Sequence, residues 1–392
     1  MIPEVWGNLP ALSGLCLWGV ILLLPWRPWS TRETLDADAI SGNDLSRITV
    51  LVPARNEADV IEQTLHGLAA QGPGLRIILI DDQSTDQTTA LALHTGIPGL
   101  KIVQGQPLPE GWIGKLWALE QGRKEVNTEL VLLLDADIRL LPGTLRTLLQ
   151  KLDRDQLDLV SLMAHLHMQG FWGRLLIPAF IFFFKLLYPF SLSNAPASHV
   201  AAAAGGCILV KKSILDKIGA FASLKNSLID DCALAHRIKA GGGRTWMGLT
   251  HSAVSQRPYH NLQDIWDMVA RNAFTQLRYS LVLLALCTFL MMVAFLLPLV
   301  TVLSLQPAGM TTLVLMMLCY LPTLKYYGIH PLWGCLLPVT GIIYLGMTWT
   351  SACRHLYRKG STWKGRNYIR TTATPGNRDV KQVEAKRSER RQ

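Results

Sequence analysis

The chain has few cysteines, and no two of them form a CxxC motif. The seven cysteines lie at positions 16, 207, 232, 287, 319, 335 and 353. Disulfide-rich domains and structural zinc sites have recurring, closely spaced cysteines. The sequence therefore argues against both kinds of framework.

Charged residues are missing from three long stretches, 5–26, 281–324 and 331–353. About 20 apolar residues in a helix are enough to cross the hydrocarbon core of a bilayer. The hydrophobic fraction, 49%, is also high for a wholly soluble protein. The sequence therefore predicts membrane segments near both ends of the chain, the C-terminal ones over residues 281–353.

The first 30 residues favour an uncleaved anchor over a secretory signal. No basic residue precedes the apolar core, and no clear small-residue cleavage site follows it. Glu4 lies before the apolar stretch, whereas Arg27 and Arg32 come after it. The positive-inside tendency then places Met1 outside and the domain that follows, residues 45–260, in the cytoplasm.

Most of the net charge of +10 lies in the last segment, residues 354–392, which has twelve basic residues against three acidic ones. Few aromatic residues accompany this charge, so base stacking on nucleic acid is disfavoured. Beside a membrane, attraction to anionic lipid headgroups is the better interpretation. Three full C-terminal crossings would place this tail outside, against the positive-inside tendency. We therefore expect one C-terminal segment to be re-entrant or interfacial and the tail to be cytoplasmic.

Apolar β-rich runs alternate with helical patterns through the middle of the chain. The runs lie at 48–52, 76–80, 101–103, 129–134 and 157–162, and the helical patterns lie at 59–70, 86–94, 115–124 and 142–152. Such alternation is typical of βαβ units. We therefore predict an α/β domain with a mostly parallel central sheet, whose ligands bind beyond the carboxyl ends of the strands.

Polar residues follow three of these strands. The motifs are PARNE at 53–57, DDQSTD at 81–86 and DAD at 135–137. Each motif alone is ordinary turn and helix-capping chemistry. Their occurrence at three strand ends favours one shared ligand site.

With these motifs the sequence resembles glycosyltransferase family 2, the inverting transferases with a GT-A fold that use nucleotide-activated sugars. The resemblance covers about residues 48–280 and includes VPARNE, DDQSTD, LDAD and a later DDCAL, in the family's order. LPEGWIGKLWAL at 108–119 and WKGRNY at 363–368 resemble the membrane-bound subgroup that modifies isoprenoid lipids. Within that subgroup the sequence is most similar to hopene-associated glycosyltransferases of bacterial hopanoid gene clusters.

The resemblance implies a multi-pass protein of the bacterial inner membrane with nucleotide-sugar, membrane and lipid partners and no nucleic acid. The donor would be a UDP-sugar and the acceptor a hopanoid-type or other isoprenoid lipid. Undecaprenyl phosphate and a carotenoid-type acceptor remain alternatives, and so does a non-catalytic membrane scaffold.

The same resemblance assigns the DAD motif to a metal. Asp135 and Asp137 form the family's DxD motif, which holds Mg²⁺ or Mn²⁺ against the donor diphosphate. Hard divalent cations are often bound in this way, through one or two carboxylates and substrate phosphates.

Further donor-side residues follow from the resemblance. Pro53, Arg55, Glu57 and Asp82 would line the nucleoside pocket, with Asp82 accepting a hydrogen bond from the base. Lys115, in the GWIGK loop, is a candidate for contact with the donor phosphates. Its alternative is a solvated lysine at the start of a helix.

Inversion requires a base that takes the proton from the acceptor hydroxyl as its oxygen attacks the anomeric carbon. By resemblance this base is Asp231, with Asp230 as its neighbour. Gly205 and Gly206 allow close backbone approach and are placed on the acceptor side. His236 is interpreted as a structural side chain.

Processive family members carry a Q-x-x-R-W motif on an interfacial helix. Here residues 275–279 are Thr-Gln-Leu-Arg-Tyr, which departs from the motif at its first and last positions. The departure favours transfer of a single sugar. Arg278 and Arg271 are candidates to neutralise diphosphate charge, and Gln276 is included on the donor side.

Two segments indicate contact with the bilayer surface. Residues 170–190 are rich in phenylalanine but contain basic residues, and residues 261–280 have amphipathic spacing. Both segments would place the active site at the surface of the bilayer. A pair of core helices is the alternative.

Overall fold

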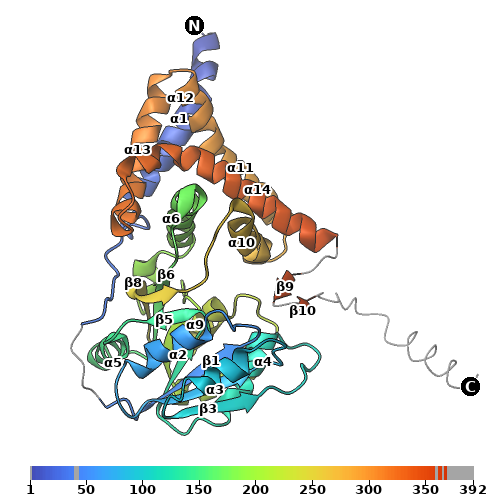
Figure 1. Ribbon diagram of the computed structural model, residues 1–392. Coiled ribbons are helices and arrows are strands. Elements are labelled where there is room, and N and C mark those ends of the chain that lie inside the picture. Colours follow the sequence, from blue (N-terminus) through green and yellow to red (C-terminus); the bar gives the residue numbers. More distant parts are fainter. Residues whose placement is uncertain (1, 39–43, 358–360, 364–365, 369–392) are drawn as a thin grey trace, which may run out of the picture.

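A sheet domain and a bundle of apolar helices meet along one edge of the sheet (Figure 1). The computed structural model describes residues 2–38, 44–357, 361–363 and 366–368, and it describes side chains within 12–38 and 44–357. Eight strands form one mixed sheet in the order β3-β2-β1-β4-β7-β6-β8-β5. The α/β class expected from the sequence is confirmed.

The first four strands are parallel and coincide with the first four β-rich runs. Their bounds are Ile48–Ala54 (β1), Arg76–Asp81 (β2), Leu100–Gln104 (β3) and Leu130–Leu134 (β4). The accompanying helices are α2 (Ile61–Ala69), α3 (Thr88–His94), α4 (Gly114–Arg123) and α5 (Thr144–Arg154). The predicted alternation of strand and helix is therefore confirmed through residue 154.

The second half of the sheet reverses direction. Strand β7 (Cys207–Lys211) lies between β4 and β6 (Leu159–His165) and is antiparallel to both. Strand β8 (Thr245–Ser255) runs parallel to β6, and the three-residue β5 (Ile138–Leu140) pairs antiparallel with β8. Because β7 runs against its neighbours, its amino end lies beside the carboxyl ends of β4 and β6.

Helices cover both faces of this sheet because its strands are apolar on both sides. In β1, Val50 and Val52 pack on one face and Leu51 on the other, as the two-residue period of a strand requires. Helices α2, α3 and α5 pack on the Val50 face. Helices α4, α8 (Lys212–Lys217) and α9 (Asp230–Ala240) pack on the Leu51 face with the 3₁₀ turn η1 (Phe221–Leu224).

The helical bundle contains the N-terminal helix and most of the C-terminal third. Its elements are α1 (Ile2–Leu23), α11 (Leu281–Met291), the π-helical turn η2 (Met292–Leu296), α12 (Leu297–Leu303), α13 (Pro307–Tyr326), η3 (Pro331–Leu336) and α14 (Leu337–Leu356). Four segments among the described residues are long and apolar enough to cross a membrane: 170–187, 281–303, 307–326 and 331–356.

Helices α6 (Gly170–Leu187) and α10 (Leu262–Gln276) lie between the sheet and the bundle (Figure 1). The Lys185 ammonium of α6 is buried, and it donates to the Ser30 carbonyl at 3.1 Å and to the Thr323 hydroxyl at 2.9 Å. The Lys185 ammonium of this apolar helix is therefore held by protein oxygens. It also ties α6 to α13 and to the segment that follows α1.

The chain lies beside the sheet domain before η3 and beside α10 at the end of α14. Before η3, the Tyr326 carbonyl at the end of α13 lies 3.1 Å from Nε2 of His251 on β8. After it, Arg354 pairs with Asp267 of α10 at 2.5 Å. The short strands β9 (Ser361–Trp363) and β10 (Arg366–Tyr368) then form an antiparallel pair, with β9 beside α10. These strands hold part of the WKGRNY motif, and the rest of that motif and most of the basic tail lie outside the described residues.

This course of the chain predicts where the C-terminus lies. We expect a reporter fused after Gln392 to report the same compartment as one inserted at the exposed turn containing Gly242. A fusion truncated after Leu305, between α12 and α13, should report the opposite compartment. Paired alkaline phosphatase and fluorescent-protein fusions would measure this. Opposite signals from the Gln392 and Gly242 reporters would show that α14 crosses the membrane.

Candidate active site

The carboxyl ends of β1, β2 and β4 bring the three polar motifs to one edge of the sheet. Backbone hydrogen bonds fix their positions: the Asp82 N–H donates to Ala54 O at 2.8 Å, and the Asp135 N–H donates to Gly206 O at 3.1 Å. The DxD motif is therefore anchored directly to the turn that enters β7. The shared site expected from the sequence has a structural basis in this convergence.

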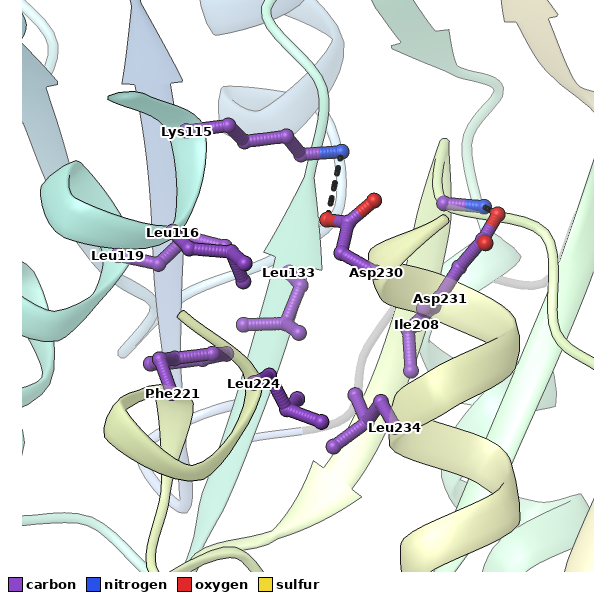
Figure 2. A pocket seen from close by; sticks show the side chains of 11 residues that line it. Lys115, Leu116, Leu119, Leu133, Ile208, Phe221, Leu224, Asp230, Asp231 and Leu234 are labelled. Atoms are coloured by element: carbon purple, nitrogen blue, oxygen red, sulfur yellow. Dashed lines mark hydrogen bonds and ion pairs between the residues drawn. The ribbon is translucent and has the colours of Figure 1, made fainter. Parts of the chain in front are cut away.

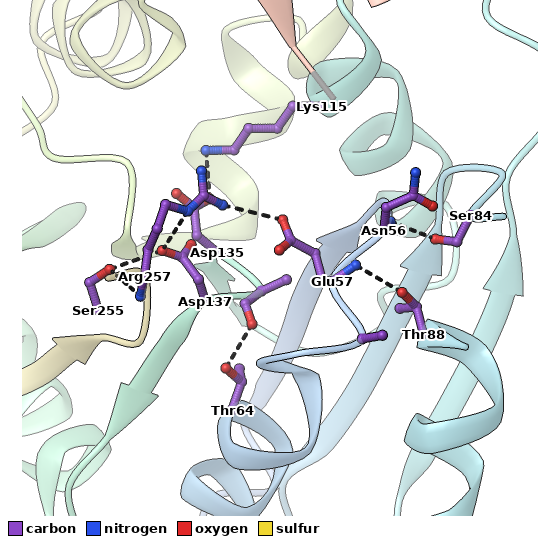
Figure 3. Close-up of polar contacts among 12 residues, drawn as sticks. Asn56, Glu57, Thr64, Ser84, Thr88, Lys115, Asp135, Asp137, Ser255 and Arg257 are labelled. Atoms are coloured by element: carbon purple, nitrogen blue, oxygen red, sulfur yellow. Dashed lines mark hydrogen bonds and ion pairs between the residues drawn. The ribbon is translucent and has the colours of Figure 1, made fainter. Parts of the chain in front are cut away.

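Lys115, at the start of α4, lies between two acidic motifs. Its Nζ is 2.7 Å from Oδ1 of Asp135 and 3.6 Å from Oδ2 of Asp230 (Figures 2 and 3). Burial opposes the lysine charge, but Asp135, Asp230 and Asp231 outweigh it and raise the pKa of Lys115. Lys115 is therefore a partner of the site carboxylates, and its alternative as a solvated lysine is wrong.

Asp137 contacts residues at the end of β8 and just after it. Its Oδ2 accepts a hydrogen bond from Ser255 Oγ at 3.0 Å and lies 3.7 Å from Nε of Arg257. The same guanidinium reaches Glu57, with Nη2 at 3.4 Å from Oε1 (Figure 3). Sequence reasoning missed Ser255 and Arg257. No sequence pattern marked them, because the SQRP stretch follows a strand that polar residues interrupt and that was not itself predicted.

The acidic pair Asp230 and Asp231 begins helix α9. Asp231 Oδ2 accepts the Gly205 N–H at 2.8 Å, and its Oδ1 accepts the Cys232 N–H at 2.7 Å. Burial and the neighbouring Asp230 raise the pKa of Asp231 to about 6, whereas Lys115 and the two backbone N–H groups act in the lowering direction. Asp231 thus lacks the direct ion pair that Asp230 makes.

Gly205 leaves room for the Lys115 and Asp231 side chains. A Cβ atom at this position would lie 3.2 Å from Asp231 Oδ2 and 3.3 Å from Lys115 Nζ. These are tighter than ordinary van der Waals contacts, so a side chain there would displace the lysine or the carboxylate. Gly206 lies beside Ile138 and Ala164, at ordinary contact distance.

A small apolar pocket lies against Asp230 and Asp231 (Figure 2). Its apolar walls come from α4, β4, η1 and α9, and include Leu116, Leu119, Leu133, Phe221, Leu224 and Leu234. These side chains remove water from one side of the acidic pair. Burial is the larger cause of the raised pKa of Asp231, ahead of the charge of Asp230.

The predicted nucleoside residues lie together at the ends of β1 and β2. Arg55 Nη1 donates to the carbonyls of Asp82 and Gln83, at 2.6 and 3.1 Å. Glu57 donates its N–H to Thr88 Oγ1 at 2.8 Å, and Asp82 is fully buried. Pro53 lies beyond the last β1–β4 pair, Leu51 with Leu133, so its missing N–H costs that ladder no hydrogen bond.

The α10 residues occupy a different place. Gln276 Oε1 accepts a hydrogen bond from the Tyr188 hydroxyl at 2.7 Å, and Arg271 and Arg278 are exposed. Within residues 44–357, no hydrogen bond or ion pair joins these three side chains to the carboxylates of Asp135, Asp137, Asp230 or Asp231. Their donor contact stays a prediction. His236 is exposed on α9 and is no part of the core.

The mixed sheet, the carboxylate pair after β4 and the acidic start of α9 define a GT-A domain. The mannosyltransferase PcManGT from Pyrobaculum calidifontis, solved with GDP-Man and Mn²⁺, has the same fold. It covers 90% of this chain and 100% of its own, with a TM-score of 0.54 and 20% identity. Residues 49–219 match the model of Glycosyl transferase family 2. This match spans less than half of the chain and lies within the sheet domain.

Curated relatives with similar sequences carry one name, 4,4'-diaponeurosporenoate glycosyltransferase. The protein from Staphylococcus aureus (strain bovine RF122 / ET3-1) is 32% identical over 114 residues, 29% of this chain and 29% of its own. The one from Staphylococcus haemolyticus (strain JCSC1435) is 28% identical over 123 residues, 31% of this chain and 32% of its own. The chain thus matches less than a third of the length of either relative.

The donor atoms after β4 fit a hard divalent cation. No group of three or more His, Cys, Asp or Glu side chains suited to a metal occurs among the described residues. Mg²⁺, however, is commonly held by one or two carboxylates, with substrate phosphates and water completing its shell. Asp135 and Asp137 supply such an oxygen-only pair, with Lys115 and Arg257 balancing their charge.

This fit predicts metal-dependent binding of nucleotide. We expect Mn²⁺ to strengthen the binding of UDP or GDP to the wild-type protein. Asp137→Ala should reduce that gain at least about tenfold, because loss even of an outer-shell partner typically costs 10–100-fold in metal affinity. Titration calorimetry with and without Mn²⁺ would measure it.

Asp216→Ala is the matched control, because Asp216 pairs with Arg123 and Lys212 on α4 and α8, outside the DxD motif. An undiminished Mn²⁺ effect in the Asp137 variant would show that the DxD motif does not hold the metal.

Proposed function

We propose that this chain is an inverting glycosyltransferase that moves one sugar from a nucleotide-sugar donor to an isoprenoid lipid in the membrane. One observation carries the proposal: the DxD carboxylates (Figure 3), Lys115 and the Asp230–Asp231 pair (Figure 2) meet at the sheet edge that faces the apolar helices. The links from β6 to α6 and from β8 to α10 leave this same edge.

On the donor side, Asp135 and Asp137 would hold Mg²⁺ or Mn²⁺. The metal, when bound, neutralises charge that develops on the departing diphosphate. Lys115 and Arg257 add fixed positive charge beside the two carboxylates. Pro53, Arg55, Glu57 and Asp82 would bind the nucleoside, and Arg271, Gln276 and Arg278 would approach the donor from α10.

On the acceptor side, Asp231 would take the proton of the attacking group. Its carboxylate is oriented by the N–H groups of Gly205 and Cys232, and its raised pKa brings it close to neutral pH. A general base works best when its pKa lies near the working pH. Asp230 is instead paired with Lys115, which makes it the less suitable base.

For the acceptor, the apolar helices around the site support a membrane lipid. A hopanoid-type lipid is our first candidate, because the GWIGK and WKGRNY motifs resemble the isoprenoid-modifying subgroup. A carotenoid-type acceptor is the second, because the curated relatives are named for one. We further propose a bacterial inner-membrane location with the sheet domain in the cytoplasm, since basic residues follow α1.

The proposed base gives a direct test. Asp231→Asn keeps the shape of the side chain but removes the proton acceptor. Sugar transfer should fall by about 10²–10⁴-fold, the usual contribution of general-base catalysis. Radiolabelled transfer to extracted bacterial lipids would measure turnover, and calorimetry would show that nucleotide binding is retained. Asp216→Asn is the control, and a larger loss in Asp230→Asn would move the base to Asp230.

The raised pKa of Asp231 predicts the pH profile. The carboxyl is protonated and inactive below its pKa of about 6, and it becomes an active base as the pH rises through that value. Wild-type turnover at saturating substrate should therefore increase between about pH 5 and pH 7. The residual activity of Asp231→Asn should lack this limb. The same limb in both proteins would assign it to another group.

A further inference from the structure

The guanidinium of Arg257 lies between two of the polar motifs of the candidate site (Figure 3). Its Nε is 3.7 Å from Oδ2 of Asp137 in the DxD motif, and its Nη2 is 3.4 Å from Oε1 of Glu57 in the PARNE motif. The DxD motif is the proposed metal end of the donor site, and the PARNE motif belongs to the proposed nucleoside end. The guanidinium therefore lies in the interval that a donor diphosphate would have to bridge.

The two ion pairs of this guanidinium are long. Charge-assisted N–H···O bonds usually measure about 2.7–2.9 Å, so neither carboxylate holds the arginine in its best geometry. The Arg257 side chain is also 40% exposed, whereas the Lys115 side chain is 20% exposed and lies 2.7 Å from Asp135. Of these two cations beside the DxD motif, the arginine is the one that can exchange partners at small cost.

The backbone around Arg257 is held more tightly than its side chain. The Gln256 N–H donates to the Asp137 carbonyl at 2.6 Å, and Ser255 Oγ donates to Asp137 Oδ2 at 3.0 Å. The same Ser255 oxygen accepts the Arg257 N–H at 3.3 Å. Pro258 follows, and its ring fixes the next φ angle. The guanidinium can therefore turn from one partner to another while its Cα stays beside the DxD motif.

We propose that Arg257 is an internal counter-ion that competes with the divalent cation for Asp137 until a nucleotide arrives. Without nucleotide, the guanidinium neutralises the Asp137 carboxylate and lowers its affinity for metal. The phosphates of a bound nucleoside diphosphate offer the guanidinium better acceptors, because the planar arginine fork matches phosphate oxygens. The arginine then releases Asp137 to the metal. This inference rests on the proposed function, and it adds the order in which metal and donor bind.

Competition of this kind makes metal binding and nucleotide binding depend on each other. The resting protein holds little metal, and the donor binds together with its cation. When the nucleoside diphosphate leaves, the guanidinium returns to Asp137 and weakens the hold on the metal. By linkage, the factor by which nucleotide strengthens metal binding equals the factor by which metal strengthens nucleotide binding. Both factors therefore include the contribution of Arg257.

The binding of metal without nucleotide tests the competition directly. Arg257→Gln should tighten the binding of Mn²⁺ alone by about two- to fivefold, the range that corresponds to a partly exposed ion pair. An arginine that only supported the shape of the site would, when replaced, weaken metal binding or leave it unchanged. The paramagnetic resonance signal of free Mn²⁺, titrated with the full chain in micelles of an uncharged detergent, would measure the affinity.

A second variant shows that the gain belongs to the DxD motif. When Asp137→Ala is combined with Arg257→Gln, the gain in Mn²⁺ affinity should disappear, because the carboxylate for which arginine and metal compete is gone. Such a double-mutant cycle isolates the coupling between the two residues. Arg257→Lys keeps a cation beside Asp137, so the affinity for Mn²⁺ alone should stay close to that of the wild type.

The same titration in the presence of UDP or GDP gives the nucleotide dependence. Nucleotide should strengthen Mn²⁺ binding less in Arg257→Gln than in the wild type, because the variant has no competing guanidinium to draw away. Arg47→Gln is the matched control. Arg47 also joins two carboxylates, with Nε 3.0 Å from Glu129 and Nη1 3.4 Å from Asp153, but it precedes β1, at the opposite end of the strand from the site.

The outcomes separate this inference from the proposed function. Weaker or unchanged binding of Mn²⁺ alone to Arg257→Gln would overturn the inference, and so would a gain that persists in the double variant. An equal gain in Arg47→Gln would also overturn it, because the effect would then come from a general loss of positive charge. A wild-type protein that binds no nucleotide, with or without Mn²⁺, would instead contradict the proposed function.

Discussion

The contact of one lysine with two acidic motifs holds the candidate site together. Lys115 brings Asp135, at the end of β4, and Asp230, at the start of α9, to the same ammonium group. Without that cation, adjacent buried carboxylates would repel one another and take up protons. The donor side and the acceptor side thus share a single counter-charge. Gly205 fits this crowding, because a Cβ atom there would push the lysine or the Asp231 carboxylate out of its present position.

Local sequence patterns were enough to predict the parallel half of the sheet. The runs that became β1 to β4 are strongly apolar and are separated by helical patterns. The spacing of their apolar residues and the length of each run are therefore enough to distinguish strands from helices. Strands β5, β7 and β8 were missed. β5 has three residues, β7 follows an alanine and glycine stretch without strand character, and β8 is interrupted by polar residues. Their pairing depends on partners far away in the chain.

The candidate site was also predictable from the sequence only in part. The position of Asp135 and Asp137 at a strand end singled them out, the family resemblance added the Asp230–Asp231 pair, and the fold brings all four to one edge of the sheet. The sequence patterns did not reveal Arg257. A single arginine after a strand has no distinctive pattern until the structure shows Asp137 and Glu57 around it. Gln276 likewise resembled a donor ligand by position alone, whereas its described partner is the Tyr188 hydroxyl. The choice between lipid acceptors depends on the shape and charge around Asp231, which no short motif encodes.

The buried ammonium of Lys185 has a consequence for biogenesis. It joins the Ser30 carbonyl, near the start of the chain, to the Thr323 hydroxyl, which is made only after the whole sheet domain has been synthesised. The contact between Lys185 and Thr323 can therefore form only after α13 has been synthesised, whereas the contact with Ser30 needs only the first half of the chain. A chain that stops before α13 therefore keeps α1 and the apolar segment 281–303, but it leaves the Lys185 ammonium without its Thr323 partner.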